Sequence, residues 1–180
     1  MNVEPLALDG AFRIRPEPRG DERGYLIRLF CREEFAAAGL ADCTRQISEV
    51  VNAAAHTLRG LHFQRPPHAE TKLIAVVRGA VFDVLVDVRP GSPTYGRWEG
   101  FELAAGDSAL IYAPAGLAHG YLTLTDDSAM LYGMDVAYAA DHAAGIAFDD
   151  PALAIPWPHP PAVIADRDRA WPTLAELAGG

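Results

Sequence analysis

The sequence predicts an all-β domain, a small sandwich or barrel built from many short strands. Between residues 24 and 136, apolar or alternating segments of strand length follow one another closely. Dense turn signals separate them, among them Arg65-Pro-Pro, Arg89-Pro-Gly-Ser-Pro and Pro114-Ala-Gly. No helical segments alternate with these strands, which argues against a parallel α/β sheet. We therefore expect one β-rich domain over residues 1–180.

The strand pattern is clearest in Ala80–Val88. Its even-numbered residues from Phe82 to Val88 are apolar and share one face, whereas Asp83 and Asp87 lie on the other. The remaining predicted strands are Gly24–Phe30, Arg45–Val51, Leu58–Gln64, Lys72–Arg78, Trp98–Leu103, Ser108–Tyr112, His119–Leu124 and Ala129–Asp135.

Helix signals are few. Arg32–Ala38, ended by Gly39, is predicted as a short helix, and Pro172–Leu177 as another. The proline-rich tail from Pro151 to Pro161 is expected to cross the β-domain as an extended arm.

Composition excludes several classes of protein. A net charge of −9 and a pI near 5.0 do not fit a nucleic-acid-binding surface. No apolar run approaches the roughly 18 residues of a membrane span, and the N-terminus does not read as a signal peptide. Only Cys31 and Cys43 carry thiols, so a reduced, cytoplasmic protein is the simpler expectation.

One segment resembles the cupin superfamily of jelly-roll barrels. From Gly106 to His119 the chain has a strand, a Pro-Ala-Gly turn and a histidine that enters the next strand. In metal-binding cupins this histidine joins an earlier His-x-His and a glutamate, but here the earlier strand has only His62-Phe-Gln. A site made of His62, His68, Glu70 and His119 is chemically conceivable. Because His68 falls in a turn where a solvated ring is expected, we predict that the protein uses no metal or other cofactor.

A whole-domain resemblance supplies the substrate. An ordered set of motifs runs from about residue 20 to residue 174. It includes Arg23-Gly-Tyr-Leu-Ile-Arg-Leu-Phe, Leu58-Arg-Gly-Leu-His-Phe-Gln, Lys72-Leu-Ile-Ala-Val-Val-Arg-Gly, Asp87-Val-Arg-Pro-Gly-Ser-Pro, Pro114-Ala-Gly-Leu-Ala-His, Leu131-Tyr132, Gly145-Ile-Ala-Phe-Asp-Asp-Pro and Asp166-Arg-Asp-Arg-Ala-Trp-Pro. Together these motifs resemble the dTDP-4-dehydrorhamnose 3,5-epimerase family.

The resemblance implies a cupin-type jelly-roll β-barrel with a few short flanking helices. It also implies epimerisation at C3, at C5 or at both carbons of a nucleotide-linked 4-keto-6-deoxyhexose, with dTDP-4-keto-6-deoxyglucose as the first candidate. A C4 ketone acidifies the protons on both neighbouring carbons. Inversion therefore needs a base, an acid on the opposite face and a stabiliser of the enolate oxygen.

The family's motifs assign these roles to residues of this chain. His62 matches the base, with Asp168 as the carboxylate that orients its ring. Lys72 matches the stabiliser of the enolate, and Tyr132 matches the acid. On residue type alone, His62 and Tyr132 could equally be core side chains, Lys72 an exposed strand end and Asp168 a surface charge.

Supporting residues follow from the same match. His119 and Asp83 correspond to positions around the lysine and the sugar. If Asp83 points inward it needs a partner, and Lys72 and His119 are the candidates. The alternative is that Asp83 faces water.

Substrate-binding residues form a second group. Arg23 and Arg59 match the arginines that hold the pyrophosphate. Gln46 and Tyr138 match residues near the nucleotide, and Asn52 is grouped with them.

The chain departs from the family pattern at four positions. Ser48 and Val50 replace an asparagine and a serine, His56 replaces a glycine, and Gly133 replaces a bulky residue after Tyr132. These changes leave the sugar, the nucleotide and the number of inverted carbons open.

Other readings remain at this stage. They are a non-catalytic sugar-nucleotide-binding cupin, a metal-dependent oxygenase and a 3,4-ketoisomerase that would use similar acid–base groups. The family resemblance also implies a homodimer in which N-terminal strands such as Gly24–Phe30 are exchanged.

Overall fold

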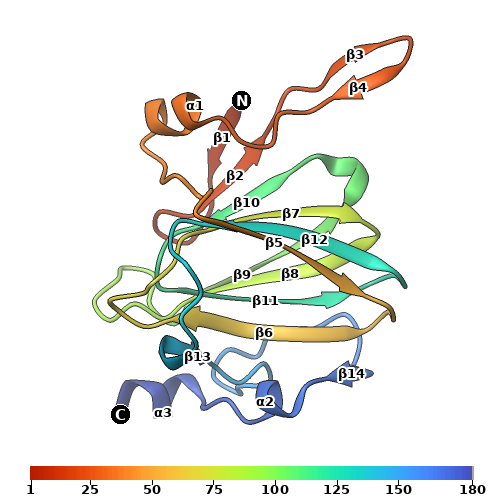
Figure 1. Ribbon diagram of the computed structural model, residues 1–180. Helices are drawn as coiled ribbons and strands as arrows, with labels where there is room; N and C mark the ends of the chain where they lie inside the picture. The colour runs from red at the N-terminus through yellow and green to blue at the C-terminus, as the bar shows by residue number, and fades with distance from the viewer. Residues whose placement is uncertain (180) are drawn as a thin grey trace.

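Two β-sheets face each other in the computed structural model, which describes residues 1–179 (Figure 1). The first sheet has the strand order β1 (Asn2–Pro5), β2 (Phe12–Arg15), β10 (Leu110–Ala113), β7 (Lys72–Arg78), β12 (Ser128–Met134) and β5 (Gln46–Asn52). The second has the order β13 (Ala143–Gly145), β6 (Thr57–Gln64), β11 (Leu117–Thr123), β8 (Ala80–Asp87) and β9 (Trp98–Ala104). The all-β jelly-roll prediction is confirmed, although the two sheets are separately hydrogen-bonded layers and do not close into one barrel.

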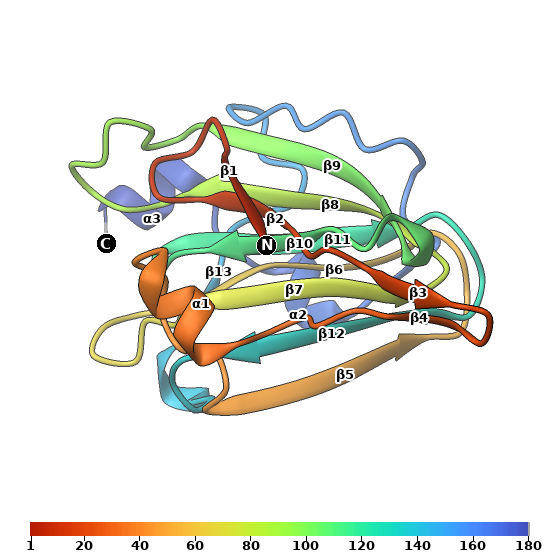
Figure 2. The ribbon, with the colours of Figure 1, turned by 90° about the horizontal axis from the view of Figure 1, so that it is seen from above.

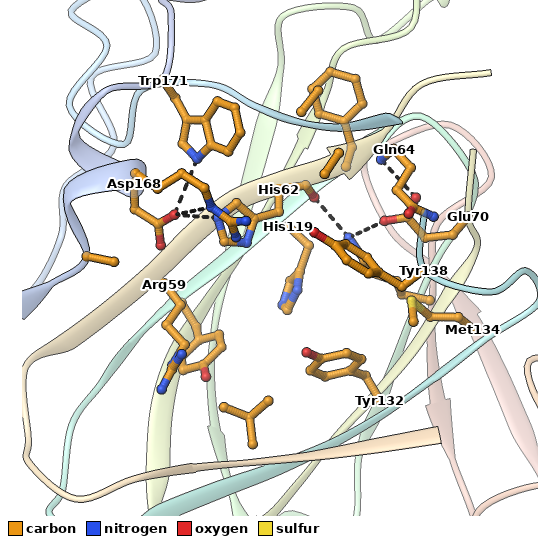
Figure 3. A pocket seen from close by; sticks show the side chains of 18 of the residues that line it. Arg59, His62, Gln64, Glu70, His119, Tyr132, Met134, Tyr138, Asp168 and Trp171 are labelled. Carbon is orange, nitrogen blue, oxygen red and sulfur yellow. Dashed lines mark hydrogen bonds and ion pairs between the residues drawn. The ribbon is translucent and has the colours of Figure 1, made fainter. Parts of the chain in front are cut away.

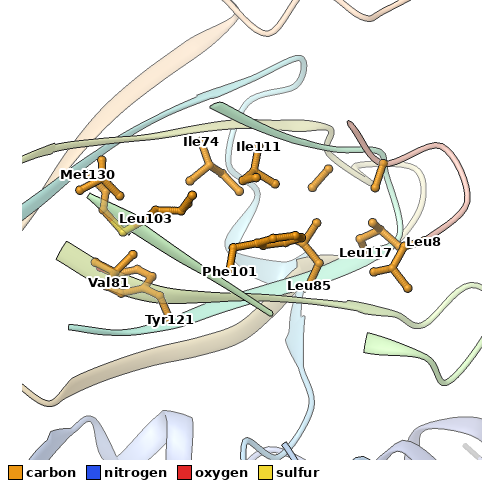
Figure 4. Close-up of a cluster of buried hydrophobic side chains, with 13 residues drawn as sticks. Leu8, Ile74, Val81, Leu85, Phe101, Leu103, Ile111, Leu117, Tyr121 and Met130 are labelled. Carbon is orange, nitrogen blue, oxygen red and sulfur yellow. The ribbon is translucent and has the colours of Figure 1, made fainter. Parts of the chain in front are cut away.

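Buried hydrophobic side chains form three clusters. Between the sheets lies a cluster that includes Ile74, Leu85, Phe101 and Met130 (Figure 4). A second cluster, which includes Val84, Val86 and Ile155, packs the outer face of the second sheet against the C-terminal segments. A third cluster packs the outer face of the first sheet against the helix α1 (Arg32–Ala37).

Strand β8 carries apolar side chains on both of its faces. Val84 and Val86 belong to the outer cluster, whereas Leu85 belongs to the cluster between the sheets. The strand is thus covered on both sides, and Asp83 points into the molecule with none of its surface exposed. The alternative in which Asp83 faces water is wrong.

The predicted strand Gly24–Phe30 is too long. Strand β4 covers only Gly24–Leu26 and pairs with β3 (Arg19–Asp21) in a two-stranded hairpin. This hairpin projects from the rest of the chain (Figures 1 and 2), so no neighbouring strand is available to pair with residues 27–30. The N-terminal strands β1 and β2 were not predicted.

The C-terminal part of the chain runs under the second sheet, as Figure 1 shows. The predicted arm does pack on the β-domain, since Leu153 and Ile155 lie in the outer cluster and Trp98 Nε1 donates to the carbonyl of Leu153 at 2.8 Å. It is not extended throughout, because residues 151–153 form a turn. Strand β14 (Val163–Ile164) then pairs with the start of β6 in parallel, and helix α2 (Asp166–Arg169) follows directly. This route brings α2 beside β6.

The remaining helical segments are short. They are η1 (Ala105–Asp107), η2 (Ala140–His142) and α3 (Leu174–Gly179), the last of which corresponds to the predicted helix Pro172–Leu177. Within residues 1–179, no helix is both long enough and apolar enough to cross a membrane.

The Asp87-Val-Arg-Pro-Gly-Ser-Pro motif has a structural role. The Asp87 carboxylate is fully buried and accepts hydrogen bonds from Arg89, Ser92 and Thr94. Arg89 Nη2 also donates to the carbonyl of Asp9 at 2.7 Å, which fastens the N-terminal loop to the β8–β9 connection. Although burial opposes its ionisation, these donors hold the pKa of Asp87 at about 2.

We expect Asp87→Asn to lower the free energy of unfolding by about 2–3 kcal/mol, because the partly buried Arg89 loses its charge complement and the buried network around Asp87 loses hydrogen bonds. The folded pKa lies below the ordinary value of 3.8, so the stabilisation is present above pH 3.8 and is lost as the pH falls towards 2. Urea unfolding between pH 7 and pH 2.5 measures both effects. Asp149→Asn, at an exposed position, is the control; equal stability losses in the two variants would contradict the assignment.

Candidate active site

A cavity of about 440 Å³ lies between the two sheets and is closed on one side by the segment around α2 (Figure 3). Side chains from β5, β6, β7, β11, β12 and α2 line it. Most of the predicted site residues meet here: Gln46, Arg59, His62, Lys72, His119, Tyr132, Tyr138 and Asp168. Asn52, Asp83 and Arg23 do not line the cavity.

An irregularity in β6 lets two functional side chains face the same cavity. Arg59 and His62 are three residues apart, and in a regular strand they would point to opposite faces. The pairing of β6 with β11 shifts register between these two positions, as a β-bulge does. Gly60 occupies the irregular position with φ 121°, and a Cβ there would lie 2.8 Å from the carbonyl oxygen of His119. Only glycine fits this close approach.

His62 is paired with Asp168, as predicted. The Nε2 atom of His62 lies 2.7 Å from Oδ1 of Asp168, and the backbone N–H of Gly60 donates to Oδ2 of the same carboxylate at 3.2 Å. Burial disfavours the carboxylate, but the His62 contact and the Gly60 donor outweigh it and hold the pKa of Asp168 below its usual value. With Nε2 engaged by the carboxylate, Nδ1 is the ring nitrogen left to take a proton from a bound molecule.

Lys72 is held by Glu70. Its ammonium contacts Oε1 of Glu70 at 2.8 Å and donates to the carbonyl of His62 at 2.9 Å. The other oxygen of Glu70 accepts the backbone N–H of Gln64 at 2.8 Å. Both side chains are buried, and two contacts leave one of the three ammonium protons for a bound oxygen. The exposed-lysine alternative is wrong.

Asp83 forms a second histidine–carboxylate pair. Its Oδ1 lies 2.6 Å from Nε2 of His119, and His119 stands directly opposite His62 across the β6–β11 ladder. Of the two partners predicted for Asp83, His119 is therefore correct, whereas Lys72 pairs with Glu70. A buried carboxylate needs such a partner, and His119 in turn lines the cavity.

Tyr132 reaches the cavity from β12 in the sheet opposite His62 (Figure 3). Burial raises its pKa, while the positive charge of Arg59 acts in the opposite direction. The phenol is therefore protonated at neutral pH and can serve as a proton donor.

Arg59 is oriented by Asn52. The Nε atom of Arg59 donates to Oδ1 of Asn52 at 2.8 Å, and the Asn52 amide also contacts the hydroxyl of Tyr121 at 3.2 Å. Asn52 itself is buried behind the guanidinium and does not line the cavity. Its substrate-binding role stays a prediction, and the contact that the structure shows is the one with Arg59.

Gln46 and Tyr138 lie together at the edge of the cavity. Oε1 of Gln46 accepts the backbone N–H of Tyr138 at 3.0 Å, and Tyr138 is 52% exposed. Arg23 lies elsewhere, in the β3–β4 hairpin, with 85% of its side chain exposed and Asp21 as its partner. Within one chain, Arg23 therefore does not reach the cavity.

Several cavity residues escaped sequence reasoning, among them Glu70, Arg167 and Trp171. Glu70 was considered only as a metal ligand, and Arg167 and Trp171 were quoted only as part of a motif. For Arg167 and Trp171 the available signal was their closeness in sequence to Asp168, because a tail that delivers Asp168 must deliver its neighbours too.

The alternative metal site does not assemble. Its residues have other contacts: His62 with Asp168, His119 with Asp83, Glu70 with Lys72, and the ring of His68 against His142. In the part of the chain that the structure describes, no group of three His, Cys, Asp or Glu side chains is placed to hold a metal ion.

Two departures from the family pattern have a backbone explanation. His56 has φ 58°, a left-handed conformation that glycine adopts without strain. At Gly133, a Cβ would collide with the carbonyl oxygen of Cys43, so a larger residue requires a different path of that segment.

A family model matches nearly the whole chain. The model for dTDP-4-dehydrorhamnose 3,5-epimerase matches residues 5–176. The chain belongs to the dTDP-4-dehydrorhamnose 3,5-epimerase family. It is 42% identical over 179 residues to the dTDP-4-dehydrorhamnose 3,5-epimerase of Sinorhizobium fredii, an alignment that covers 98% of this chain and 91% of the relative.

Solved structures of the family have the same fold. The Mycobacterium tuberculosis epimerase superimposes with a TM-score of 0.93 at 38% identity, covering 99% of this chain and 91% of its own. A 3'-monoepimerase from Streptomyces bikiniensis, in complex with dTDP-quinovose, gives a TM-score of 0.90 at 37% identity, covering 98% and 90%. Single and double epimerases are thus similar to this chain at nearly the same level.

We expect Asp168→Asn to lower the epimerase kcat by about 10²–10⁴-fold, because an amide neither stabilises the imidazolium nor fixes the ring tautomer. Asp166→Asn is the matched control, since Asp166 is exposed on the same short helix α2. Steady-state kinetics on both variants, with circular dichroism to verify folding, provides the measurement. Equal kcat values for Asp168→Asn and the wild type would refute the role of the pair.

Proposed function

We propose that the protein epimerises C3, or C3 and C5, of a nucleotide-linked 4-keto-6-deoxyhexose, with dTDP-4-keto-6-deoxyglucose as the first candidate. The observation that carries this proposal is the placement of His62 and Tyr132 on facing sheets of one cavity, with the Lys72 ammonium beside the base. Membership of the family supplies the class of reaction.

The reaction follows from these positions. Nδ1 of His62 takes the proton from the carbon next to the ketone, and Asp168 stabilises the resulting imidazolium. The electron pair moves to the ketone oxygen, where the remaining proton of the Lys72 ammonium is the available donor. Tyr132 then returns a proton to the opposite face of the carbon, and exchange with solvent restores the phenol and the imidazole.

Two guanidinium groups are assigned to the diphosphate. Arg59 and Arg167 both line the cavity, and the only other cationic side chain among its lining residues, Lys72, is paired with Glu70. Guanidinium groups match phosphate oxygens well. Gln46 and Tyr138, at the cavity edge, are assigned to the nucleotide.

The other functions fit less well. A protein that only binds a sugar nucleotide has no need of a paired base, a buried lysine and a phenol in one cavity. A 3,4-ketoisomerase could use the same groups and is separated by its product.

Incubation with dTDP-4-keto-6-deoxyglucose in D2O, followed by NMR, tests the proposal. We expect deuterium at C3, or at both C3 and C5, with equal rates in the presence and absence of EDTA. His62→Ala should abolish incorporation, whereas the control His159→Ala, on the exposed arm, should not. The site of labelling then distinguishes single from double epimerisation.

Failure has distinct forms. A moved ketone would assign the isomerase, and loss of exchange with EDTA would restore a metal-dependent mechanism. Absence of exchange across a panel of nucleotide-linked ketosugars would refute the enzyme assignment.

A homodimer is the second part of the proposal. The β3–β4 hairpin projects from the chain and exposes Tyr25 and Leu26 by 68% and 63%, while Ile47 and Val51 on edge strand β5 are exposed by 65% and 48%. Exposed apolar side chains on a hairpin and a sheet edge suit pairing with a second copy. Arg23 on the hairpin would then serve the cavity of the partner. A cytoplasmic location remains a prediction.

Subunit mixing tests the exchange of Arg23. Arg23→Ala and His62→Ala homodimers should each have low activity. After unfolding and refolding together, mixed dimers should contain one cavity with both residues and recover up to about half of the wild-type activity per mixed dimer. No recovery in mixtures that sedimentation velocity identifies as dimers would rule out the sharing.

A further inference from the structure

Trp171 contacts Asp168, Arg167 and His62. Its indole N–H donates to Oδ1 of Asp168 at 3.4 Å, the same oxygen that contacts His62 (Figure 3). Its ring also meets the ring of His62 edge-on, with centroids 6.0 Å apart and an interplanar angle of 74°. On the other side, the guanidinium of Arg167 lies 5.7 Å from the indole centroid.

Core packing does not account for this position. Trp171 lines the cavity and belongs to none of the three hydrophobic clusters. It packs against strand β13 at Gly145, where a Cβ would lie 2.6 Å from the indole. The missing side chain at Gly145 thus lets the indole approach β13, and the adjacent Pro172 carbonyl accepts the N–H of Ala147 at 2.8 Å.

Three contacts together restrict the catalytic pair. Asp168 Oδ2 is fixed by the backbone of Gly60, and Oδ1 by His62 and Trp171, so each carboxylate oxygen has at least one donor. The edge-on indole limits rotation of the His62 ring. A cation over the indole face is in turn attracted to it, and together with the 3.8 Å ion pair between Arg167 and Asp168 this favours one placement of the largely exposed Arg167 side chain.

We propose that Trp171 is a positioning residue that orients the His62–Asp168 pair and holds Arg167 towards the bound diphosphate. This inference rests on the proposed function for its substrate and deepens it. The indole then couples proton abstraction to anion binding through a single side chain.

Two substitutions separate the two roles. Trp171→Phe keeps a ring for Arg167 but removes the N–H donor, so kcat and the C3 deuterium-exchange rate should fall about three- to tenfold while KM changes little. Trp171→Ala should in addition raise KM. In an Arg167→Ala background, Trp171→Ala should raise KM no further, because the two changes act on the same contact. Trp157→Phe, in the same arm but outside the cavity, should behave as wild type.

A measurement without substrate keeps the inference independent of the assigned reaction. In proton NMR, the hydrogen-bonded Nε2 proton of His62 should be resolved in the wild type and in Trp157→Phe, and should broaden or shift upfield in Trp171→Phe. This result would support the positioning role even if no ketosugar were turned over. An unchanged His62 signal in Trp171→Phe, or kcat losses equal in Trp171→Phe and Trp157→Phe, would overturn it.

Discussion

The contact between His62 and Asp168 is the constraint on which the site depends. The two residues are 106 positions apart, and they meet only because the C-terminal segment runs under the second sheet. Parallel pairing of β14 with β6, the hydrogen bond from the Trp98 indole to the Leu153 carbonyl and the outer hydrophobic cluster hold that segment in place. The histidine without this segment would be a partly exposed side chain on a strand. Docking of the arm is therefore what turns a β-sandwich into a candidate enzyme.

Buried carboxylates around the cavity share one feature. Every buried carboxylate near the cavity has a cationic or imidazole partner: Asp168 with His62, Asp83 with His119, and Glu70 with Lys72. Unpaired, each would be costly to desolvate. The pairing also fixes which atoms remain free, namely Nδ1 of His62 and one proton of Lys72. Those free atoms point to a reaction in which a proton leaves carbon while charge gathers on oxygen.

The sequence predicted strands better than it predicted partners. Lys72–Arg78 was bounded correctly because a continuous apolar run sits between clear turn signals. The length of β4 was not predictable in the same way, since a strand ends where its neighbour ends, and β3 is short. Partner choice also depends on three-dimensional placement. Asp83 could be matched to Lys72 or His119 by residue type, and only the β8–β11–β6 register selects His119.

A motif match likewise identifies residues but does not show whether they contact the substrate directly or position another residue. Asn52 and Arg23 both belong to matched segments, yet one lies behind Arg59 and the other on a projecting hairpin. Neither residue lines the cavity of its own chain, and a match in sequence does not show this. The Asp87 motif is the opposite case, because its strong pattern reflects a buried hydrogen-bond network and not substrate contact.

The number of inverted carbons depends on the cavity walls more than on the catalytic groups. C3 and C5 flank the same ketone, so one base, one enolate stabiliser and one acid suffice for both if the sugar can present each carbon in turn. A family that contains both single and double epimerases is consistent with this argument. The residues that decide the outcome must then be those that limit how the sugar lies. Val50, which lines the same cavity as Arg59 and Tyr132, is apolar at a position where the family pattern has a hydroxyl group. A change of that kind alters the placement of the sugar and leaves His62, Lys72 and Tyr132 untouched.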